Sequence, residues 1–190
     1  SGGPGRIVKV DLNPSNTFQI LDSFALNSGD NWPIRAVIDQ TNLLAYFGIG
    51  NMNPGAIVKV DVNPLNTFQQ VGRITLNSGE NFSIGTRGGV VIDTTNNFAY
   101  FHTNGSPAII IKIDTNPSNF ARVAALTLNS GEDNVSTALI DTTNGYAYFG
   151  TMTSPGKIVK VQLSTFTRVS AYTLNTGDNF VLAGAIDVTG

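Results

Sequence analysis

One stretch of the chain decides the fold class. Residues 144–162 read Asn-Gly-Tyr-Ala-Tyr-Phe-Gly-Thr-Met-Thr-Ser-Pro-Gly-Lys-Ile-Val-Lys-Val-Gln. Aromatic and β-branched residues fill two short runs, at 146–151 and 157–162, and these residue types favour β-strands. Pro155 and Gly156 separate the runs, because proline cannot donate a hydrogen bond to a strand ladder. The stretch therefore predicts two successive strands joined by a short connection.

The same motifs recur in a fixed order along the 190 residues. Pro-Gly, or Pro-Ala in one degenerate copy, precedes an apolar run at Pro4, Pro54, Pro107 and Pro155, with spacings of 50, 53 and 48 residues. The other motifs are Leu-Asn-Ser/Thr-Gly, Ile-Asp and Ala-Tyr-Phe. They begin at Leu26, Leu76, Leu128 and Leu174, at Ile38, Ile92, Ile140 and Ile186, and at Ala45, Ala99 and Ala147. Such regular recurrence indicates tandem repeats.

Each repeat contains four short segments of strand character. In the third copy they cover residues 137–141, 146–151, 157–162 and 166–174, and no segment carries the 3.6-residue apolar period of a helix. Four strands in 40–50 residues are typical of a propeller blade. We predict an all-β, β-propeller-type repeat of four-stranded antiparallel blades. The single domain, 1–190, divides into repeats at about 4–35, 36–87, 88–137 and 138–180, and 181–190 begins a further blade.

The chain also resembles a known repeat family. Residues 144–151, the following Pro155-Gly156 and the run 158–161 (Ile-Val-Lys-Val) are similar to the second and third strands of YVTN-type β-propeller repeats. In particular, the chain resembles the blade arrays of large surface proteins, notably of protists. The resemblance covers the whole chain and implies blade architecture, but it implies little about a ligand because propellers serve many roles.

The repeats start and stop inside a blade. The chain opens with a third strand at residues 6–12 and is expected to close with a first strand at 181–187, so one blade lacks its second strand. Three arrangements fit: a compact four-bladed ring with one three-stranded blade, a larger ring of two chains, or a part of a longer repeat array. An unpaired strand edge is a template for another chain. We therefore favour self-association, either as a homo-oligomer or with neighbouring repeats of a longer chain.

Composition excludes several classes of partner and site. The net charge is −2 and only 13% of residues are charged, whereas binding to nucleic acid needs clustered Lys and Arg. No apolar run reaches the roughly 18 residues that span a bilayer. Cysteine is absent, which removes disulfides and thiolate sites. No cofactor is predicted, and a neutral surface rich in Asn, Ser and Thr suits packing against similar surfaces.

Two acidic series recur with the repeat. Asp30, Glu80, Glu132 and Asp178 follow an Asn-Ser/Thr-Gly loop and are weak candidates for a calcium or polar-ligand site, although their spacing does not follow the D-x-[DN]-x-[DN]-G pattern. The other series, Asp39, Asp93, Asp141 and Asp187, follows each first strand. Because these residues precede Thr and Asn, we interpret them as turn formers whose carboxylates accept backbone N–H bonds.

A third recurring series is basic. Lys9, Lys59, Lys112 and Lys160 lie within third strands, two residues before an acid in the first three copies. We expect inter-strand ion pairs or hydrogen bonds at a blade edge.

The sequence offers no catalytic constellation. His102 is the only histidine and occupies the position of Gly48 and Gly150 in the sister repeats, and no nucleophile motif accompanies it. A histidine near a blade surface, without a catalytic role, is the interpretation we prefer. We therefore predict that the protein is not an enzyme.

Surface candidates come from one loop and from three sequons. Trp32, Phe82 and Phe180 occupy equivalent loop positions and are predicted as a ligand or protein contact. The N-x-S/T sequons start at Asn81, Asn104 and Asn134 and indicate glycosylation and an extracellular or cell-surface location.

Two functions remain open from these features. The first is a non-enzymatic structural module of an extracellular assembly or filament, which self-associates through blade edges. The alternative is a carbohydrate-binding, lectin-like propeller in which the loops of each repeat form equivalent pockets.

Overall fold

The computed structural model describes residues 3–82 and 88–188, and within them the chain forms fourteen β-strands and no helix. Blade I is a two-stranded sheet. Blades II, III and IV are four-stranded and antiparallel, with their strands paired in chain order. Strands of blades I and II are β1 (Arg6–Val10), β2 (Ile20–Ala25), β3 (Pro33–Asp39), β4 (Leu44–Ile49), β5 (Ala56–Asp61) and β6 (Gln69–Thr75). Those of blades III and IV are β7 (Val91–Asp93), β8 (Phe98–His102), β9 (Ile109–Asp114), β10 (Ala121–Thr127), β11 (Val135–Asp141), β12 (Tyr146–Thr151), β13 (Lys157–Gln162) and β14 (Thr167–Thr173). The predicted fold class is confirmed.

An Asp-anchored turn joins the first two strands of each complete blade. In blade II, one carboxylate oxygen of Asp39 accepts the N–H groups of Thr41 and Asn42 at 2.9 and 3.0 Å, and the other accepts the Asn42 side-chain amide at 2.8 Å. Asp93 and Asp141 hold their turns through the equivalent asparagines. These bonds satisfy backbone donors that the tight turn leaves without ladder partners. The turn role predicted for this series is confirmed for Asp39, Asp93 and Asp141, whereas Asp187 lies in the segment 181–187, which forms no hairpin.

Apolar side chains between successive blades form the core. The sheet faces of blades II and III bury a cluster that includes Tyr46, Ile57, Phe101 and Ile111, and further clusters lie between blades I and II and between blades III and IV. The inner strands are apolar on both faces, because each inner sheet is covered by a blade on either side. A blade therefore cannot bury its apolar surface alone, and the stack is the cooperative unit.

Tyr46 and Lys59 make polar contacts across the junction between blades II and III. The Tyr46 hydroxyl on β4 donates to the backbone carbonyl of Thr115 at 2.8 Å, and the Tyr46 ring lies 5.5 Å from that of Phe120. The neighbouring Lys59 donates to the carbonyl of Pro117 at 3.2 Å and lies 5.2 Å from the Phe120 ring centre. Lys59 thus makes a hydrogen bond, one of the two contacts expected for this series, but the bond reaches the next blade. The acids two residues further on, such as Asp61 and Asp114, anchor loops of their own blades.

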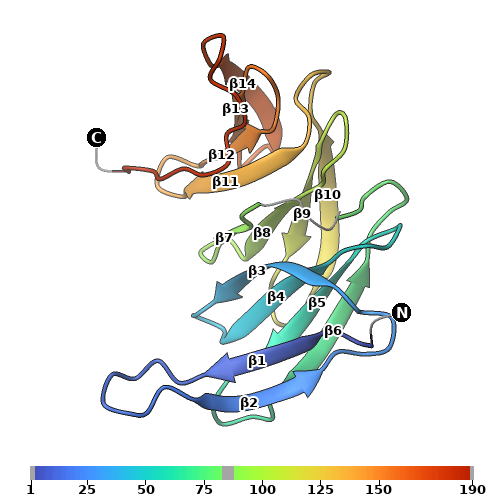
Figure 1. The fold of residues 1–190 in the computed structure, drawn as a ribbon, viewed down its shortest axis with the longest axis vertical. Coiled ribbons are helices and arrows are strands. Elements are labelled where there is room, and N and C mark those ends of the chain that lie inside the picture. The colour runs from blue at the N-terminus through green and yellow to red at the C-terminus, as the bar shows by residue number, and fades with distance from the viewer. Residues whose placement is uncertain (1–2, 83–87, 189–190) are drawn as a thin grey trace.

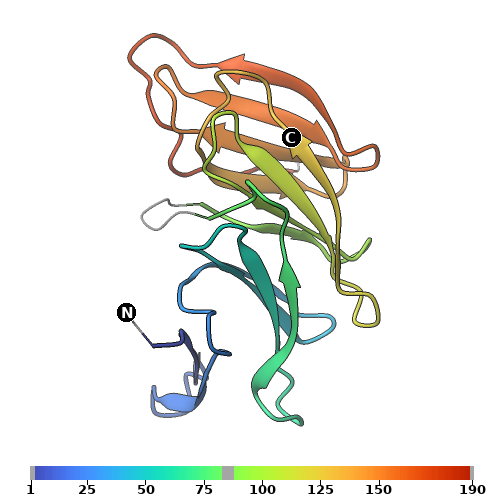
Figure 2. The ribbon, with the colours of Figure 1, turned by 90° about the vertical axis from the view of Figure 1, so that its right-hand side faces the viewer.

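The blades follow one another in an open arrangement. Blade I lies at one end of the molecule and blade IV at the other, and the two termini are near these opposite ends (Figure 1; Figure 2). The compact four-bladed ring considered from the sequence is therefore not the arrangement of this chain. Contacts join neighbours in the stack, such as β3 with β7 and β7 with β11.

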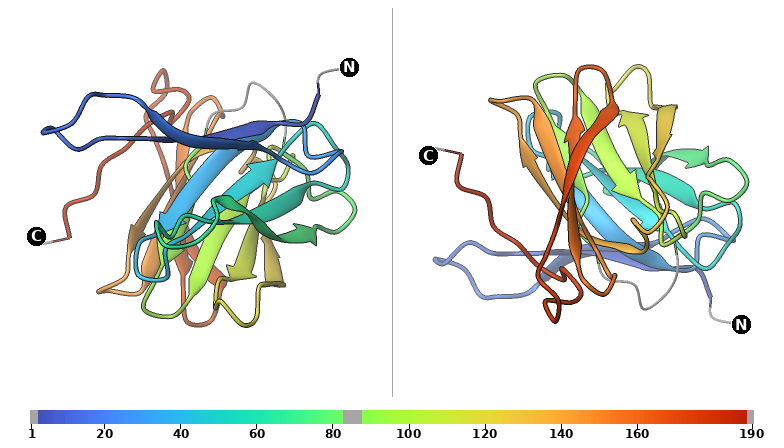
Figure 3. Two further views of the ribbon diagram at one scale, coloured as in Figure 1. Left: turned by 90° about the horizontal axis from the view of Figure 1, so that it is seen from below. Right: turned by 90° about the horizontal axis from the view of Figure 1, so that it is seen from above.

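The predicted first strand at residues 181–187 is corrected by the structure. These residues run along blade IV without forming a ladder (Figure 3). A first strand pairs with the second strand of its own blade, as β3 does with β4, and among the described residues no second strand lies in position to pair with 181–187. The segment is nevertheless held in place, because Val181 N–H donates to Thr151 at 3.0 Å and Ser136 Oγ donates to the Val181 carbonyl at 2.6 Å.

Removal of the Tyr46 hydroxyl tests the junction contact. We expect Tyr46→Phe to lower the free energy of unfolding by about 1–2 kcal/mol, because the Thr115 carbonyl loses its buried donor. Urea denaturation measures the change. Tyr172→Phe is the matched control, since this ring is exposed, and should leave stability unchanged within about 0.5 kcal/mol. Equal effects of the two variants would contradict the junction role.

Candidate functional site

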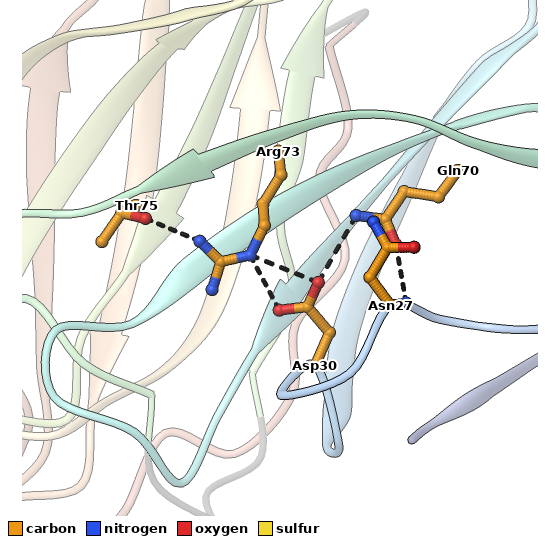
Figure 4. Close-up of polar contacts among 5 residues, drawn as sticks. All are labelled: Asn27, Asp30, Gln70, Arg73 and Thr75. Carbon is orange, nitrogen blue, oxygen red and sulfur yellow. Dashed lines mark hydrogen bonds and ion pairs between the residues drawn. The ribbon is translucent and has the colours of Figure 1, made fainter.

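The recurring acids at the ends of the blades form ion pairs between blades. Asp30, in the loop after blade I, accepts a hydrogen bond from Arg73 Nε on β6 of blade II at 2.9 Å (Figure 4). Gln70 of the same strand donates to Asp30 at 3.4 Å and accepts the Asn27 N–H at 3.3 Å. This carboxylate thus connects one blade to the next.

Acid–arginine pairs also join the next two junctions, although these arginines occupy the ladder position of Gln70 and not that of Arg73. Glu80 pairs with Arg122 on β10, and Glu132 pairs with Arg168 on β14 through an Nε–Oε2 contact of 2.9 Å. Each glutamate also accepts the first N–H of its own loop, from Asn77 or Asn129, at 3.0 Å. Each carboxylate therefore fixes a loop and a blade junction together.

Asp178 differs from the other members of this series. It is exposed, and no ion pair to it is found within the described part of the chain. Asp30, Glu80 and Glu132 each meet an arginine of the following blade, and the described residues include no sheet beyond blade IV that could place one beside Asp178. The four acids lie at successive positions along the stack, and no cluster of three or more His, Cys, Asp or Glu side chains suited to a metal occurs among residues 3–82 and 88–188.

His102 lies in a buried polar contact and not at a blade surface, which corrects that interpretation. Arg35 on β3 donates to the His102 carbonyl at 2.5 Å and lies 3.1 Å from its Nδ1. Burial, followed by the nearby charge of Arg35, lowers the pKa of His102 to about 3, so the ring is neutral at pH 7. Burial also lowers the pKa of Arg35, to about 10. A substrate in solvent has no access to this imidazole.

Glycine positions explain why a histidine fits there. In blade II, the large Arg35 faces Gly48 across the ladder. In blade III His102 occupies the position of Gly48, and Gly89 occupies the position of Arg35. The neighbouring Gly88 leaves room for the imidazole ring, since a Cβ at Gly88 would lie 2.4 Å from it. A small residue thus lies where the larger one needs space, as dense packing requires.

The three aromatic residues predicted as a contact loop differ in their exposure to solvent. Phe82 is only 1% exposed and packs against Phe101, with ring centres 6.0 Å apart, and against Gly48 of the preceding blade. Its prediction as a surface contact is therefore wrong. Trp32 and Phe180 are 43% and 49% exposed. Phe82 is covered from both sides, by Gly48 on the second strand of blade II and by Phe101 of blade III. Blade I has no second strand beside Trp32, and the described residues include no further blade to cover Phe180.

The sequon asparagines are half-buried. Asn104 uses its side chain internally: it accepts a hydrogen bond from Arg35 at 3.0 Å and donates to the Val135 carbonyl at 3.3 Å. Asn134 lies in the loop before β11 with a φ of 50°. The sequon of Asn81 ends at Ser83, outside the described residues.

The open edge of blade I is the candidate functional site. A groove of about 630 Å³ lies between β1 and the face of blade II, and it is lined mainly by apolar side chains that include Val8, Val37, Ile38 and Phe47. A second hollow of about 410 Å³ continues it past Arg6 and Pro33. In blades II to IV the equivalent edge of the third strand is paired with the second strand. The site therefore combines the unpaired edge of β1 with an adjacent groove lined by apolar side chains.

The energetic role of the acid–arginine pairs is tested at the junction of blades III and IV. Burial raises the pKa of the Glu132 carboxyl, but hydrogen bonds from Arg168 and Asn129 together lower it by more, so the pKa lies below its usual 4.5. The pair thus stabilises the fold fully above pH 4.5, and this contribution is lost as pH falls through the lowered pKa.

A double-mutant cycle of Glu132→Gln and Arg168→Met isolates this pair. We expect a coupling free energy of about 1–3 kcal/mol at pH 7, measured by urea denaturation. The coupling should disappear below the pKa of Glu132. Additive single substitutions at pH 7 would contradict an energetic role for the pair.

Comparison with known proteins identifies the fold of the chain but assigns it to no family. No family model and no curated protein matches the chain. Among solved structures, Saccharomyces cerevisiae Sqt1 superposes with a TM-score of 0.65 at 12% identity, over 92% of this chain and 47% of that one. Chaetomium thermophilum Sqt1, bound to the N-terminus of ribosomal protein L10, superposes with a TM-score of 0.64 at 16% identity, over 90% of this chain and 44% of that one.

A Lactobacillus plantarum protein gives a TM-score of 0.63 at 10% identity, over 92% of this chain and 50% of that one. The WD40 repeats of RRP9 superpose with a TM-score of 0.55 at 10% identity, over 74% of this chain and 38% of that one. The chain thus spans half or less of the length of these structures. Identities this low support the architecture alone. The chain has a β-propeller repeat fold of the kind seen in WD40 proteins.

Proposed function

We propose that the chain is a non-enzymatic structural and interaction module that associates with further blades through the open edge of blade I. One observation carries the proposal: β1 has an unpaired edge beside an apolar groove, at the position where every complete blade has a second strand. Unpaired backbone groups on a strand edge bind an added strand through regular hydrogen bonds, and a neighbouring apolar floor gives that strand a surface to bury.

A structural role agrees with the chemistry of the repeated polar residues. The recurring aspartates hold turns, three of the loop acids hold blade junctions, and His102 is buried and neutral. A reaction would require an acid–base pair that faces a substrate, and these groups are engaged in the fold.

The proposal includes an extracellular or cell-surface setting, as a repeat of a surface or filament protein related to the YVTN-type arrays. The sequons at Asn81 and Asn134 and the low share of charged residues, 13%, support that setting, whereas Asn104 uses its side-chain amide inside the fold. A neutral surface rich in hydrogen-bonding side chains carries little long-range repulsion between copies.

Sedimentation velocity across a range of protein concentrations tests the association. We expect species heavier than one chain, whose proportion rises with concentration. A single-chain mass at every concentration would overturn the proposal. Glycan binding by a chain that remains monomeric would favour the lectin-like alternative.

A further inference from the structure

We propose that a cavity between blades III and IV binds a small organic carboxylate, whose oxygens replace two backbone carbonyls that fill the corresponding space between blades II and III. The cavity has a volume of about 280 Å³ and is lined by β8, β9 and the turn after β7 from blade III, and by the turns after β11 and β13 from blade IV. Both blades are complete, so this site is separate from the open edge of blade I.

The junction between blades II and III shows how the equivalent space is filled. The connection after β9 of blade III supplies two acceptors to blade II. The Thr115 carbonyl accepts from the Tyr46 hydroxyl at 2.8 Å. The Pro117 carbonyl accepts from Lys59 Nζ at 3.2 Å. The second-strand tyrosine and the third-strand lysine of blade II are therefore both satisfied by the backbone of the next blade.

The equivalent connection of blade IV is two residues shorter. Five residues, 115–119, lie between the end of β9 and Phe120, whereas three residues, 163–165, lie between the end of β13 and Phe166. The shorter connection has no counterpart of the segment around Pro117. The space that this segment fills at the earlier junction is left as the cavity between blades III and IV.

Tyr100 and Lys112 keep unused donors at the wall of this cavity. Tyr100 faces Lys112 in the ladder as Tyr46 faces Lys59, and the two residues are only 1% and 9% exposed. Within the described residues, neither side-chain donor makes a hydrogen bond. Lys112 Nζ lies 3.8 Å from the Phe98 ring centre, but the ring covers one side of the ammonium and leaves other N–H groups free. Because a buried donor without an acceptor is costly, the cavity favours a ligand that supplies acceptors.

The cavity also has one carboxylate fewer than the space between blades II and III. There, burial and then the charges of Asp39 and Asp114 raise the pKa of Tyr46, which shows that both acids face this space. At the next junction Asp93 corresponds to Asp39, but Gln162 occupies the position of Asp114. An anion in the cavity therefore meets less repulsion than it would at the earlier junction.

The remaining groups match an anion with a single charge. One oxygen of Asp93 accepts the N–H groups of Thr95 and Asn96 at 3.1 Å, and the other accepts the Asn96 side-chain amide at 2.7 Å. Burial and then the charge of Asp93 raise the pKa of Tyr100, so this hydroxyl stays protonated and can donate. One ammonium and one hydroxyl suit the two oxygens of a carboxylate, whereas a phosphate dianion would leave a charge unbalanced beside Asp93.

The rest of the lining indicates the size and polarity of the ligand. Phe98 and Leu163 offer apolar contact, and the exposed residues Asn96, Thr142 and Ser164 offer hydrogen bonds. The volume is at the small end of the range for ligand pockets. A hydroxylated acid the size of one sugar ring, such as a uronic acid, fits these features.

An NMR titration of the chain with D-glucuronate tests the site. D-glucose is the matched ligand, because it carries a hydroxymethyl group where glucuronate carries the carboxylate. We expect saturable shifts of amides around the cavity with glucuronate, and an affinity for glucose lower by about tenfold or more, since charge-assisted hydrogen bonds are the stronger ones.

Substitutions at the cavity test the roles of the two donors. Lys112→Met should weaken glucuronate binding by about tenfold or more, and Tyr100→Phe by about fivefold. Lys59→Met is the matched control: it removes the lysine at the same strand position of blade II, where Pro117 already supplies the acceptor, and should leave the affinity unchanged within about twofold.

A loop exchange tests the origin of the cavity. Replacement of residues 163–165 by the blade III sequence Thr-Asn-Pro-Ser-Asn should supply the missing carbonyls and abolish glucuronate binding, while the dispersed amide spectrum shows that the chain remains folded.

Several results would overturn the inference. They are the absence of saturable shifts at these amides, glucuronate binding that survives Lys112→Met or the loop exchange, equal binding of glucose, and tighter binding of inorganic phosphate than of glucuronate. None of them bears on association at blade I, which sedimentation velocity tests separately.

Discussion

Burial of both faces of each blade is the constraint on which the rest of the structure depends. The inner strands are apolar on either side, and the three core clusters lie between blades and not within one. A single four-stranded sheet would expose both faces to water at a cost of roughly 25 cal/mol per Å² of apolar area. Each blade is therefore stable only against its neighbours, and every repeated polar contact serves that stacking.

The polar contacts give the stack a direction. A loop acid of one blade meets an arginine on the outer strand of the next, and a lysine of one blade meets a phenylalanine of the next. Each blade thus has a donor face and a receiving face that differ in chemistry. Among the described residues the outer surfaces of the stack belong to blades I and IV, and they differ in the same way. Complementary unlike ends are the general condition for head-to-tail association.

Sequence predicted the local elements well because each depends on a few adjacent residues. The strand expected at 157–162 is β13, and the one expected at 166–174 contains β14. The turns after each first strand followed from the Asp-Thr-Thr-Asn type of sequence, since their hydrogen bonds span only two or three residues. The phase of the repeats likewise predicted the two-stranded blade I.

Contacts between blades were not predictable in the same way. Arg122 and Glu80 are 42 residues apart, and nothing in either segment identifies the other as its partner. Trp32 and Phe82 occupy the same position of the repeat, yet one is exposed and the other buried, because only Phe82 has a complete blade beneath it. Residues 181–187 have a strand sequence without a ladder for the same reason. Repeat position fixes the conformation, whereas the neighbouring blade fixes burial.

Hydrogen–deuterium exchange of the β1 amides tests the central claim, that another chain covers the open edge of blade I, most directly. The account predicts slow exchange along Arg6–Val10 at high protein concentration and faster exchange on dilution, while the central strand β13 remains protected throughout. Fast exchange in β1 at every concentration, with β13 protected, would contradict it.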